Sequence, residues 1–370
     1  MKHYFLGMAA EYSGGRWLRH LCTMGSRRDR AELERYLAQK YSGQAILCKN
    51  GRSALALALK AFFEPGDEVI INGFTCYAVY EALRAAKLKP VFADISKDDL
   101  NFDIETLGKA LKGGTRVRGI IIQNTLGNPV DIRSIQKFAS KHNLLMIEDL
   151  AHCAGVRYDD KREAGTVGAA TVLSFGKDKS IDTISGGALV LREQPRHNVA
   201  TPSKSPRPSD YLRARCYPMF GALCRTLSYI RLGGPLMRCL VKIHWVEKSA
   251  DNKLELERRL NNFEAKLALA QLRELRKDGE SPLRGFCFVR DRAQVLHKLQ
   301  RAGYYFGSFW YEKPVSPMRY YNKVQFPEAE CPNATYVAEH IINLPNYYSR
   351  RDLQPAHKII KPYLEEGGNE

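Results

Sequence analysis

The stretch LLMIEDLAH, residues 144–152, decides how the middle of this chain is organised. Leu144 to Ile147 is a short apolar run that predicts a buried strand, and Glu148-Asp149 follows it directly. In open parallel sheets, ligands bind beyond the carboxyl ends of the strands. Asp149 therefore stands where a functional carboxylate is expected, although a strand-end cap would look the same in isolation.

Apolar strands and helices alternate along the chain on both sides of this stretch. The other strands are predicted over 68–72, 90–93, 117–123, 170–175 and 188–191. The intervening helices are predicted over 77–87, 103–112 and 131–142. Strands that are apolar along their whole length are covered on both faces, and their alternation with helices is typical of a parallel sheet with crossover helices. The sequence therefore predicts an α/β fold with a mostly parallel central sheet.

The region from 28 to 63 is predicted to be helical, with a break near 42–51. Asp29 is expected to cap a helix over 30–40. Asn50-Gly51-Arg52-Ser53 precedes a run of alternating Ala and Leu, which are strong helix formers. Because a helix N-terminus presents N–H groups and a positive dipole, Gly51, Arg52 and Ser53 are candidates for binding a phosphate.

The composition changes after Glu193, where residues 195–210 are polar and rich in proline. Residues 211–246 then carry apolar side chains at helical spacing, interrupted by Gly233-Gly234-Pro235, and the stretch 201–250 holds nine Lys/Arg against two Asp/Glu. We interpret 195–250 as a basic helical insertion. Its apolar face either packs on the protein, which we favour, or contacts a membrane surface.

Two domains are expected from this organisation. Residues 1–250 would form a large domain that includes the insertion, and residues 251–370 a smaller C-terminal α/β domain. The smaller domain would begin with a long helix over 254–276, which is rich in Leu, Ala, Glu and Arg.

The overall composition excludes several classes of protein. The chain has 57 Lys/Arg against 40 Asp/Glu, a net charge of +17 that favours an anionic partner, yet it has no pattern of a nucleic-acid-binding module. Nine cysteines without a CxxC pair indicate reduced thiols and no structural metal site. No apolar run could span a membrane and the first ten residues lack a signal-peptide core, so a cytoplasmic protein is expected.

A lysine follows the strand predicted over 170–175. The sequence there reads Ser174-Phe175-Gly176-Lys177-Asp178-Lys179, and Gly186-Gly187 comes next. The chain thus offers a phosphate cradle, a carboxylate and an amine. Pyridoxal phosphate needs these three groups: a site for its phosphate, an anion facing its pyridine nitrogen, and an amine that bonds to its aldehyde carbon.

On five stretches the chain resembles the DegT/DnrJ/EryC1/StrS sugar aminotransferase family of pyridoxal-phosphate enzymes. These stretches are 65–70, 124–129, 147–152, 174–187 and 259–272. The last, RLNNFEAKLALAQL, follows the family's RLSELQAALGLAQL-like helix position by position. The resemblance covers about 30–193 and 255–350, and it implies an aspartate-aminotransferase-like fold with a large cofactor-binding domain.

The resemblance also implies an activity. Family members move an amino group from an amino acid, with glutamate the expected donor, to a keto group of a nucleotide-linked sugar. Their active site lies between two subunits, so a homodimer is expected.

Roles for individual residues follow from the same resemblance. Asp149 corresponds to the partner of the pyridine nitrogen, His152 to a residue beside the ring, and Ser174 to a phosphate-binding serine. Gly51, Arg52 and Ser53 correspond to the phosphate cradle. Two lysines compete for the covalent bond to the cofactor. The family places it five residues after the serine and seven before the Gly-Gly pair, and both spacings select Lys179 over Lys177.

Four positions depart from the family pattern. Cys76 stands where an aromatic residue often stacks on the cofactor; it could still pack on the ring and is a candidate cofactor-binding residue, or Tyr77 could take this role. Arg52 replaces a threonine of the cradle, Ser185 an acidic residue, and Glu257 an asparagine. These departures leave open a protein of this fold that has lost catalysis and acts as a scaffold. A separate alternative is a fold-related lyase that acts on an amino acid. Lys179 argues against the family's dehydratases, which carry histidine at its position.

Overall fold

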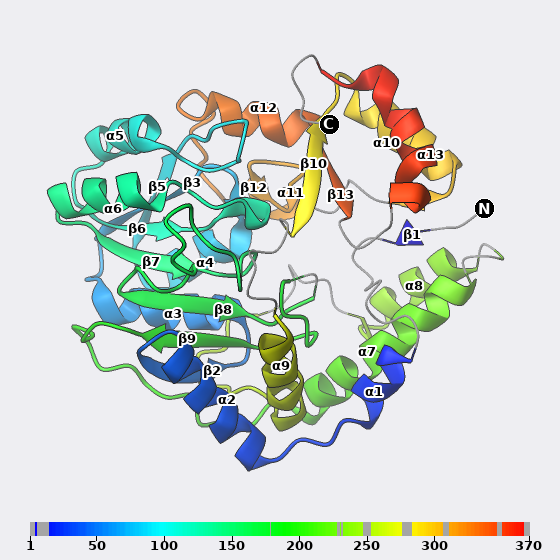
Figure 1. Cartoon of the computed structure of the whole chain (residues 1–370), viewed down its shortest axis with the longest axis horizontal. Coiled ribbons are helices and arrows are strands. Elements are labelled where there is room, and N and C mark those ends of the chain that lie inside the picture. Colours follow the sequence, from blue (N-terminus) through cyan, green and yellow to red (C-terminus); the bar gives the residue numbers. More distant parts are fainter. Residues whose placement is uncertain are drawn as a thin grey trace.

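A seven-stranded sheet forms the centre of the protein in this computed structural model (Figure 1). The structure describes residues 4–5, 15–177, 179–227, 230, 232–246, 253–275, 283–305, 311–345 and 350–365. Across the sheet the strands are β2 (Gln44–Cys48), β9 (Gly187–Leu191), β8 (Ala170–Ser174), β7 (Leu145–Asp149), β6 (Val117–Ile122), β3 (Glu68–Asn72) and β5 (Lys89–Ala93). Neighbouring strands from β8 to β5 are parallel, and β9 is antiparallel to both of its neighbours. The predicted, mostly parallel sheet is confirmed.

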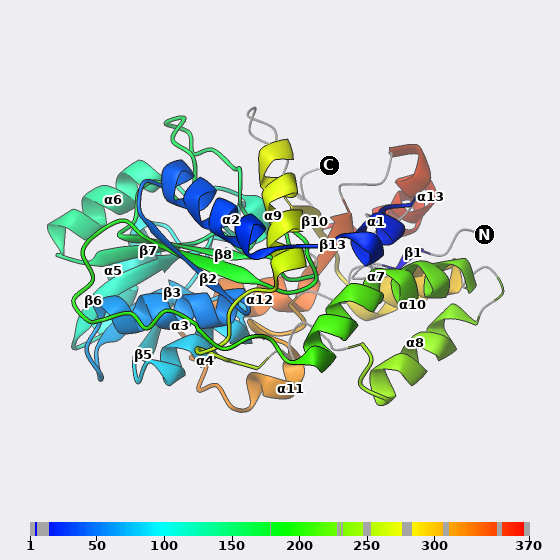
Figure 2. The ribbon, with the colours of Figure 1, turned by 90° about the horizontal axis from the view of Figure 1, so that it is seen from below.

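Helices cover both faces of the sheet, as Figure 2 shows from the side. On one face lie α3 (Gly51–Phe62) and α4 (Tyr77–Ala85). On the other lie α2 (Arg27–Lys40), α5 (Ile104–Gly113), α6 (Ile132–Lys141) and α9 (Asn262–Glu274). In strand β3, Val69 and Ile71 enter the first core and Ile70 the second. Both faces are therefore buried, which explains why the strands are apolar throughout.

Two local predictions near the N-terminus were wrong. Helix α2 is capped by Ser26, whose side chain accepts the backbone N–H of Asp29, and Asp29 is the third helical residue of this capping box. Strand β2 was not predicted, because its five residues fall in the expected break. It pairs with β9, and Gln44 lies opposite Leu191. Because this partner lies far away along the chain, the residues around 44–48 do not reveal the pairing.

The prediction of a long helix over 254–276 was also wrong about where the helix starts, since α9 begins only at Asn262. The residues before it bond to the start of α3 instead. Glu255 N–H donates to Ser53 Oγ over 2.9 Å, and Lys253 O accepts Asn50 Nδ2 over 2.9 Å. These long-range hydrogen bonds outweigh the helix propensity of the segment.

The basic insertion forms a helical hairpin at one side of the molecule (Figure 2). Its helices are α7 (Pro208–Leu227) and α8 (Gly233–Lys242), and α1 (Arg16–Cys22) packs on α7. Tyr217 and Cys224 of α7 join a small core with Phe263 and Leu267 of α9. One apolar face thus packs on the protein, as we favoured. Other large apolar side chains of the hairpin stay exposed: Leu212, Leu223, Ile230, Leu232, Ile243 and Trp245. None of the helices described is long and apolar enough to cross a membrane.

The C-terminal part has its own small core. Strands β10 (Arg284–Phe288) and β13 (Ile341–Pro345) pair antiparallel, and α10 (Arg292–Arg301) and α13 (Arg350–Ile360) contribute to this core. The remaining elements are β11 (Tyr304–Tyr305), which pairs with β1 (Tyr4–Phe5), β12 (Val315–Ser316), α11 (Met318–Tyr321) and α12 (Pro332–His340). Strand β12 pairs with β4 (Thr75–Cys76) and so joins this part to the central sheet. The proposed domain boundary at 250/251 lies outside the described residues.

The loop that follows β7 is anchored by one buried carboxylate. Glu148 is fully buried, and its two oxygens accept four hydrogen bonds of 2.7 Å. The donors are Tyr158 Oη and the backbone N–H groups of Gly165, Val167 and Gly168. These bonds position the residues next to Asp149, although Glu148 itself points away from the edge where Asp149 lies.

Glu148→Gln is expected to lower the free energy of unfolding by about 3 kcal/mol or more, because an amide N–H₂ would face donors that now have an acceptor. Urea unfolding of the purified variant measures this. Glu105→Gln is the matched control: its ion pair with Lys109 is exposed, and we expect a change below about 0.5 kcal/mol. Equal changes in the two variants would show that the four bonds contribute little.

Candidate active site

Polar side chains gather where four neighbouring strands end. Asp149 ends β7 and Ser174 ends β8, Gln123 directly follows β6, and Thr75 is the third residue after β3. Strands β3, β6, β7 and β8 are adjacent and parallel, so their carboxyl ends form one edge of the sheet. Thr75 Oγ1 bonds to Gln123 Oε1 across this edge. This is the place where ligands bind in open parallel sheets.

Lys179 and His152 meet at this edge. Lys179 Nζ lies 3.1 Å from His152 Nε2, and its charge acts on the carboxyl group of Asp149. The three side chains selected from the sequence as catalytic are therefore brought together, although 27 residues separate the lysine from the histidine. The competing lysine lies elsewhere: Lys177 is buried, with Nζ 4.4 Å from the centre of the Tyr217 ring.

Two groups flank the ring of His152. The N–H of Leu126 donates to Nδ1 over 3.2 Å, and Lys179 Nζ lies 3.1 Å from Nε2. The backbone and the lysine therefore hold the ring in one orientation.

Asp149 is a buried acid in the same cluster, with 7% of its surface exposed. Burial raises the pKa of its carboxyl group, and the N–H of Ala151, 3.0 Å from Oδ1, and the charge of Lys179 oppose this shift. A buried carboxylate is stabilised by a positive group placed next to it. The site therefore suits a ligand that presents a cation or a protonated nitrogen to Asp149.

The start of helix α3 lies directly beside Ser174. A Cβ atom added to Gly51 would come within 2.6 Å of Ser174 Cβ, so a side chain at position 51 would not fit. Asn50 caps the helix, because its side chain accepts the N–H of Ser53 over 2.8 Å. Ser53 is fully buried and its hydroxyl is engaged by Glu255, as described above. Gly51 and Ser174 therefore form the open part of the predicted cradle.

Arg52 and Cys76 both bond to helix α4. The guanidinium group of Arg52 is buried and pairs with Glu81 over 2.5 Å. Cys76 is half-buried and caps α4, with its sulfur accepting the N–H of Ala78. Tyr77, the candidate substitute for a stacking residue, instead stacks on Tyr320 with ring centres 4.6 Å apart.

Sequence reasoning missed an aromatic residue that approaches the site from the C-terminal part. The Tyr311 ring lies 4.2 Å from the Phe74 ring and 6.4 Å from the His152 ring, measured between centres. Tyr311 is 2% exposed. The residues next to Tyr311 in the sequence form no recognisable motif, so only the tertiary structure shows that this ring lies near His152.

Ser185, which stands where the family pattern has an acid, is bound to helix α9. Its hydroxyl donates a hydrogen bond to Glu264. Glu264 is fully buried and also accepts from Asn261. This contact joins the loop before Gly186 to the start of α9.

Three buried cysteines are poor nucleophiles. All nine cysteines of the chain are free thiols in this structure. Burial raises the pKa of Cys48 and Cys331 to about 12 and raises that of Cys153 further, which disfavours the reactive thiolate. Within the described residues, His, Cys, Asp and Glu form no group of three that could hold a metal ion.

Comparisons with known proteins agree with this architecture. The sequence model of the DegT/DnrJ/EryC1/StrS aminotransferase family matches residues 18–207. GDP-perosamine synthase from Caulobacter vibrioides is 34% identical over 150 residues, which are 40% of each chain. The chain spans about two-fifths of the length of the curated relatives it matches.

Two solved structures share the fold over nearly the whole chain. A DegT DnrJ EryC1 StrS aminotransferase from Brucella abortus superposes with a TM-score of 0.68 at 20% identity, covering 97% of this chain and 98% of the other. An Escherichia coli GDP-4-keto-6-deoxy-D-mannose-3-dehydratase with bound hydrated PLP gives 0.64 at 17% identity, covering 97% and 100%.

Proposed function

Because the chain belongs to the DegT/DnrJ/EryC1/StrS aminotransferase family, we propose that it is a pyridoxal-phosphate-dependent sugar aminotransferase. It would move an amino group from an amino acid, with glutamate as the expected donor, to a keto group of a nucleotide-linked sugar. One observation carries this proposal: Lys179 Nζ lies 3.1 Å from His152 Nε2, and its charge acts on the buried carboxyl group of Asp149.

The side chains at this edge fit the cofactor. A buried carboxylate, a lysine amine, and a helix start beside the Ser174 hydroxyl match a protonated pyridine nitrogen, an aldehyde and a phosphate. Lys179 would bond to the aldehyde carbon, and Asp149 would hold a proton on the ring nitrogen. Gly51 and Ser174 would bind the phosphate. Arg52, Ser53 and Cys76 would support this cradle through their contacts with Glu81, Glu255 and α4.

Each catalytic side chain then has a definite task. Pyridoxal phosphate, when bound, supplies an electron-accepting ring that stabilises negative charge at the carbon bearing the amino group. Lys179 Nζ would carry the proton between the donor carbon and the cofactor carbon as general base and acid. His152 would orient Nζ through Nε2, since the Leu126 N–H holds its ring in one position.

The direct test is transfer of nitrogen from glutamate. We expect the cofactor-loaded protein to form more than one equivalent of 2-oxoglutarate from glutamate only when a nucleotide-linked ketosugar is present in excess, with one aminosugar formed per further 2-oxoglutarate. A panel of such ketosugars with coupled detection of 2-oxoglutarate measures this. If the loaded protein releases ammonia or sulfide from an amino acid instead, the lyase alternative replaces the proposal, and if no reaction is seen, the scaffold alternative does.

The quaternary and cellular setting forms part of the proposal. We expect a homodimer in the cytoplasm, with residues 1–250 and 251–370 as its two domains. Glu257 is exposed and pairs with Lys204, so it is unsuited to bind the phosphate group. Sedimentation equilibrium tests the dimer, and a monomer would contradict it.

Peripheral membrane contact through residues 211–246 is a weaker proposal, supported by the exposed apolar side chains of the hairpin beside its basic residues. Flotation with anionic liposomes at low salt tests it, and absence of binding would dismiss it.

A further inference from the structure

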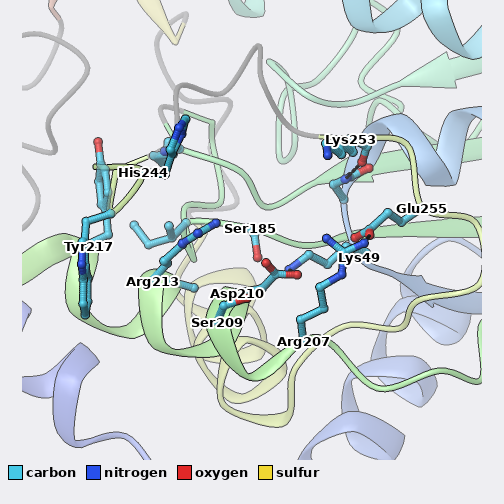
Figure 3. Close-up of a pocket in the computed structure, with 15 residues that line it drawn as sticks. Lys49, Ser185, Arg207, Ser209, Asp210, Arg213, Tyr217, His244, Lys253 and Glu255 are labelled. Atoms are coloured by element: carbon cyan, nitrogen blue, oxygen red, sulfur yellow. Dashed lines mark hydrogen bonds and ion pairs between the residues drawn. The ribbon is translucent and has the colours of Figure 1, made fainter. Parts of the chain in front are cut away.

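Different segments support the two flanks of the candidate site. On the flank of β9 and β2, the hairpin and the segment before α9 enclose a pocket of about 390 Å³ (Figure 3). Its wall carries the ion pairs Lys49–Asp210 and Arg207–Glu255. On the flank of β6, β3 and β5, the supporting side chains are instead uncharged and buried: Asn72, Asn101, Gln123 and Thr125. This second flank carries the backbone N–H that bonds to His152.

The backbone of the turn at 124–127, directly after β6, has an unusual conformation. Asn124 and Leu126 have φ angles of 49° and 54°, in the left-handed region that asparagine tolerates but leucine rarely adopts. Leu100, in the loop after β5, also has a positive φ, of 65°. Backbone of this kind persists only where the surrounding contacts impose it, and it is frequent at functional sites. Here Leu126 is the residue whose N–H donates to His152 Nδ1 over 3.2 Å.

The side chain of Asn101 holds this turn at both ends. Its Oδ1 accepts the N–H of Thr125 over 2.8 Å, and its Nδ2 donates to the carbonyl of Asn128 over 2.9 Å. Asn101 is 1% exposed, so both bonds are made away from water. They lie on either side of Leu126 and therefore help to fix the direction in which its N–H points.

The side chain of Thr125 ties the same turn to the sheet. Its Oγ1 accepts Nδ2 of Asn72, at the end of β3, over 3.0 Å, and Nε2 of Gln123 over 3.1 Å. Asn72 Nδ2 also donates to the carbonyl of Leu100 over 3.0 Å. The loop after β5 and the turn after β6 are thus bonded to each other and to the sheet. Relaxing the left-handed residues would break several of these buried bonds together.

We propose that Asn101 is a positioning residue for His152. By holding the turn, it keeps the N–H of Leu126 on Nδ1 of that ring. The other ring nitrogen, Nε2, then stays 3.1 Å from Lys179 Nζ. The consequence for amino transfer rests on the proposed function, in which Lys179 carries the proton. Asn101 acts through the turn and not on the reacting atoms.

Asn101→Ala is the test variant, and Asn333→Ala is its matched control. Asn333 is half-buried, and its Nδ2 donates to the carbonyl of Ile95, in the loop after β5, over 2.8 Å. Asn101 Nδ2 donates to the carbonyl of Asp99 in the same loop. Both changes thus remove an asparagine side chain bonded to this loop, and Asn101→Ala also removes the bonds to the turn.

Amide hydrogen exchange, followed by NMR with and without pyridoxal phosphate, reports on the turn independently of activity. We expect the Leu126 amide of Asn101→Ala to exchange at least about tenfold faster relative to the amides of β7, which report on global stability. The nitrogen resonance of His152 Nδ1, identified by its absence in His152→Gln, should also move, because the ring loses its donor. Asn333→Ala should match the wild type in both measurements.

Kinetics connect the turn to amino transfer. In the loaded protein, Asn101→Ala should lower the single-turnover rate constant for converting glutamate to 2-oxoglutarate by about tenfold or more, since a misplacement of about 1 Å can cost on the order of 10²-fold. The glutamate concentration that gives half of the maximal rate should change little, because Asn101 is not assigned to binding. Asn101→Asp keeps an oxygen that accepts the Thr125 N–H, so it should recover part of the rate. It replaces Asn101→Ala in every measurement if that variant does not fold.

Each outcome decides the inference. It is overturned if the Leu126 amide and the His152 resonance behave alike in Asn101→Ala and in the control. If they change and the loaded protein keeps the wild-type rate constant, Asn101 is merely structural and the inference also falls. If the wild type converts no glutamate, the proposed function fails, and the exchange rates and the His152 resonance still decide whether Asn101 positions the ring.

Discussion

Lys179→Ala is expected to abolish amino transfer, lowering kcat by about 10⁴-fold or more, because the variant loses both the amine that bonds to the cofactor and the general base. The wild type loaded with pyridoxal phosphate should show an absorption band near roughly 410–430 nm that borohydride removes with covalent attachment to Lys179, and the variant should lack it. The spectrum therefore tests the role of Lys179 independently of activity.

Lys177→Ala provides the matched control, since it removes the competing lysine only two residues away. Lys177 packs on Tyr217 rather than at His152, so its variant should keep the band and the borohydride attachment. Peptide mapping after reduction locates the modified lysine. If the label appears on Lys177, or if Lys179→Ala retains the band, the assignment of Lys179 is wrong.

Asp149→Asn is expected to lower kcat/KM by about 10³-fold, the size of effect seen when one preorganised electrostatic partner of a reacting group is removed. Asn keeps the shape of the side chain but carries no charge, so it could not hold a proton on the ring nitrogen of the cofactor. Steady-state kinetics with saturating cofactor measure the loss.

In the cofactor-free protein, Asp149→Asn should not lower the free energy of unfolding at pH 8. Burial raises the pKa of Asp149 above that of the unfolded chain, so the protonated form is favoured by folding. The contribution of Asp149 to stability is thus complete at pH values below its unfolded pKa of about 3.9 and is lost as the pH rises through its folded pKa. Asp149→Asn should therefore match the wild type at low pH and be at least as stable at pH 8.

Thermal unfolding of both proteins across this pH range provides the control for the kinetics. A variant that loses activity but keeps its stability at pH 8 has lost a functional charge. A variant that is less stable at pH 8 would show that the Asp149 charge is structural, and the loss of activity would then say nothing about the cofactor.

Much of the central sheet follows from local sequence. The apolar runs ending at Asn72, Ile122 and Asp149 are short and are separated by helices of ordinary length, so their order along the chain implies a parallel sheet. Burial on both faces gives each strand its continuous apolar character. The choice between Lys177 and Lys179 also rests on counting along the sequence, because the family that the chain resembles places the lysine at fixed distances from Ser174 and Gly186.

The features that sequence reasoning missed depend on partners far apart in the chain. Strand β2 exists because Gln44–Cys48 finds β9, and α9 starts late because residues 253–255 bond to the cap of α3. Tyr311 reaches His152 from the C-terminal part. In each case a distant hydrogen bond or ring contact outweighs a local preference worth only a few tenths of a kcal/mol to about 1 kcal/mol per residue.

The sequence by itself therefore determined the α/β class and the order of the main strands and helices, and its resemblance to the family pointed to the acid, the imidazole and the amine of the candidate site. Tertiary structure alone decided how His152 is oriented by the N–H of Leu126, how Ser185 bonds to Glu264, and which face of the hairpin packs on α9. The physical reason is that strand and helix formation depends on neighbouring residues, whereas hydrogen-bond geometry, burial and net charge in a cavity depend on which distant segments the fold brings into contact.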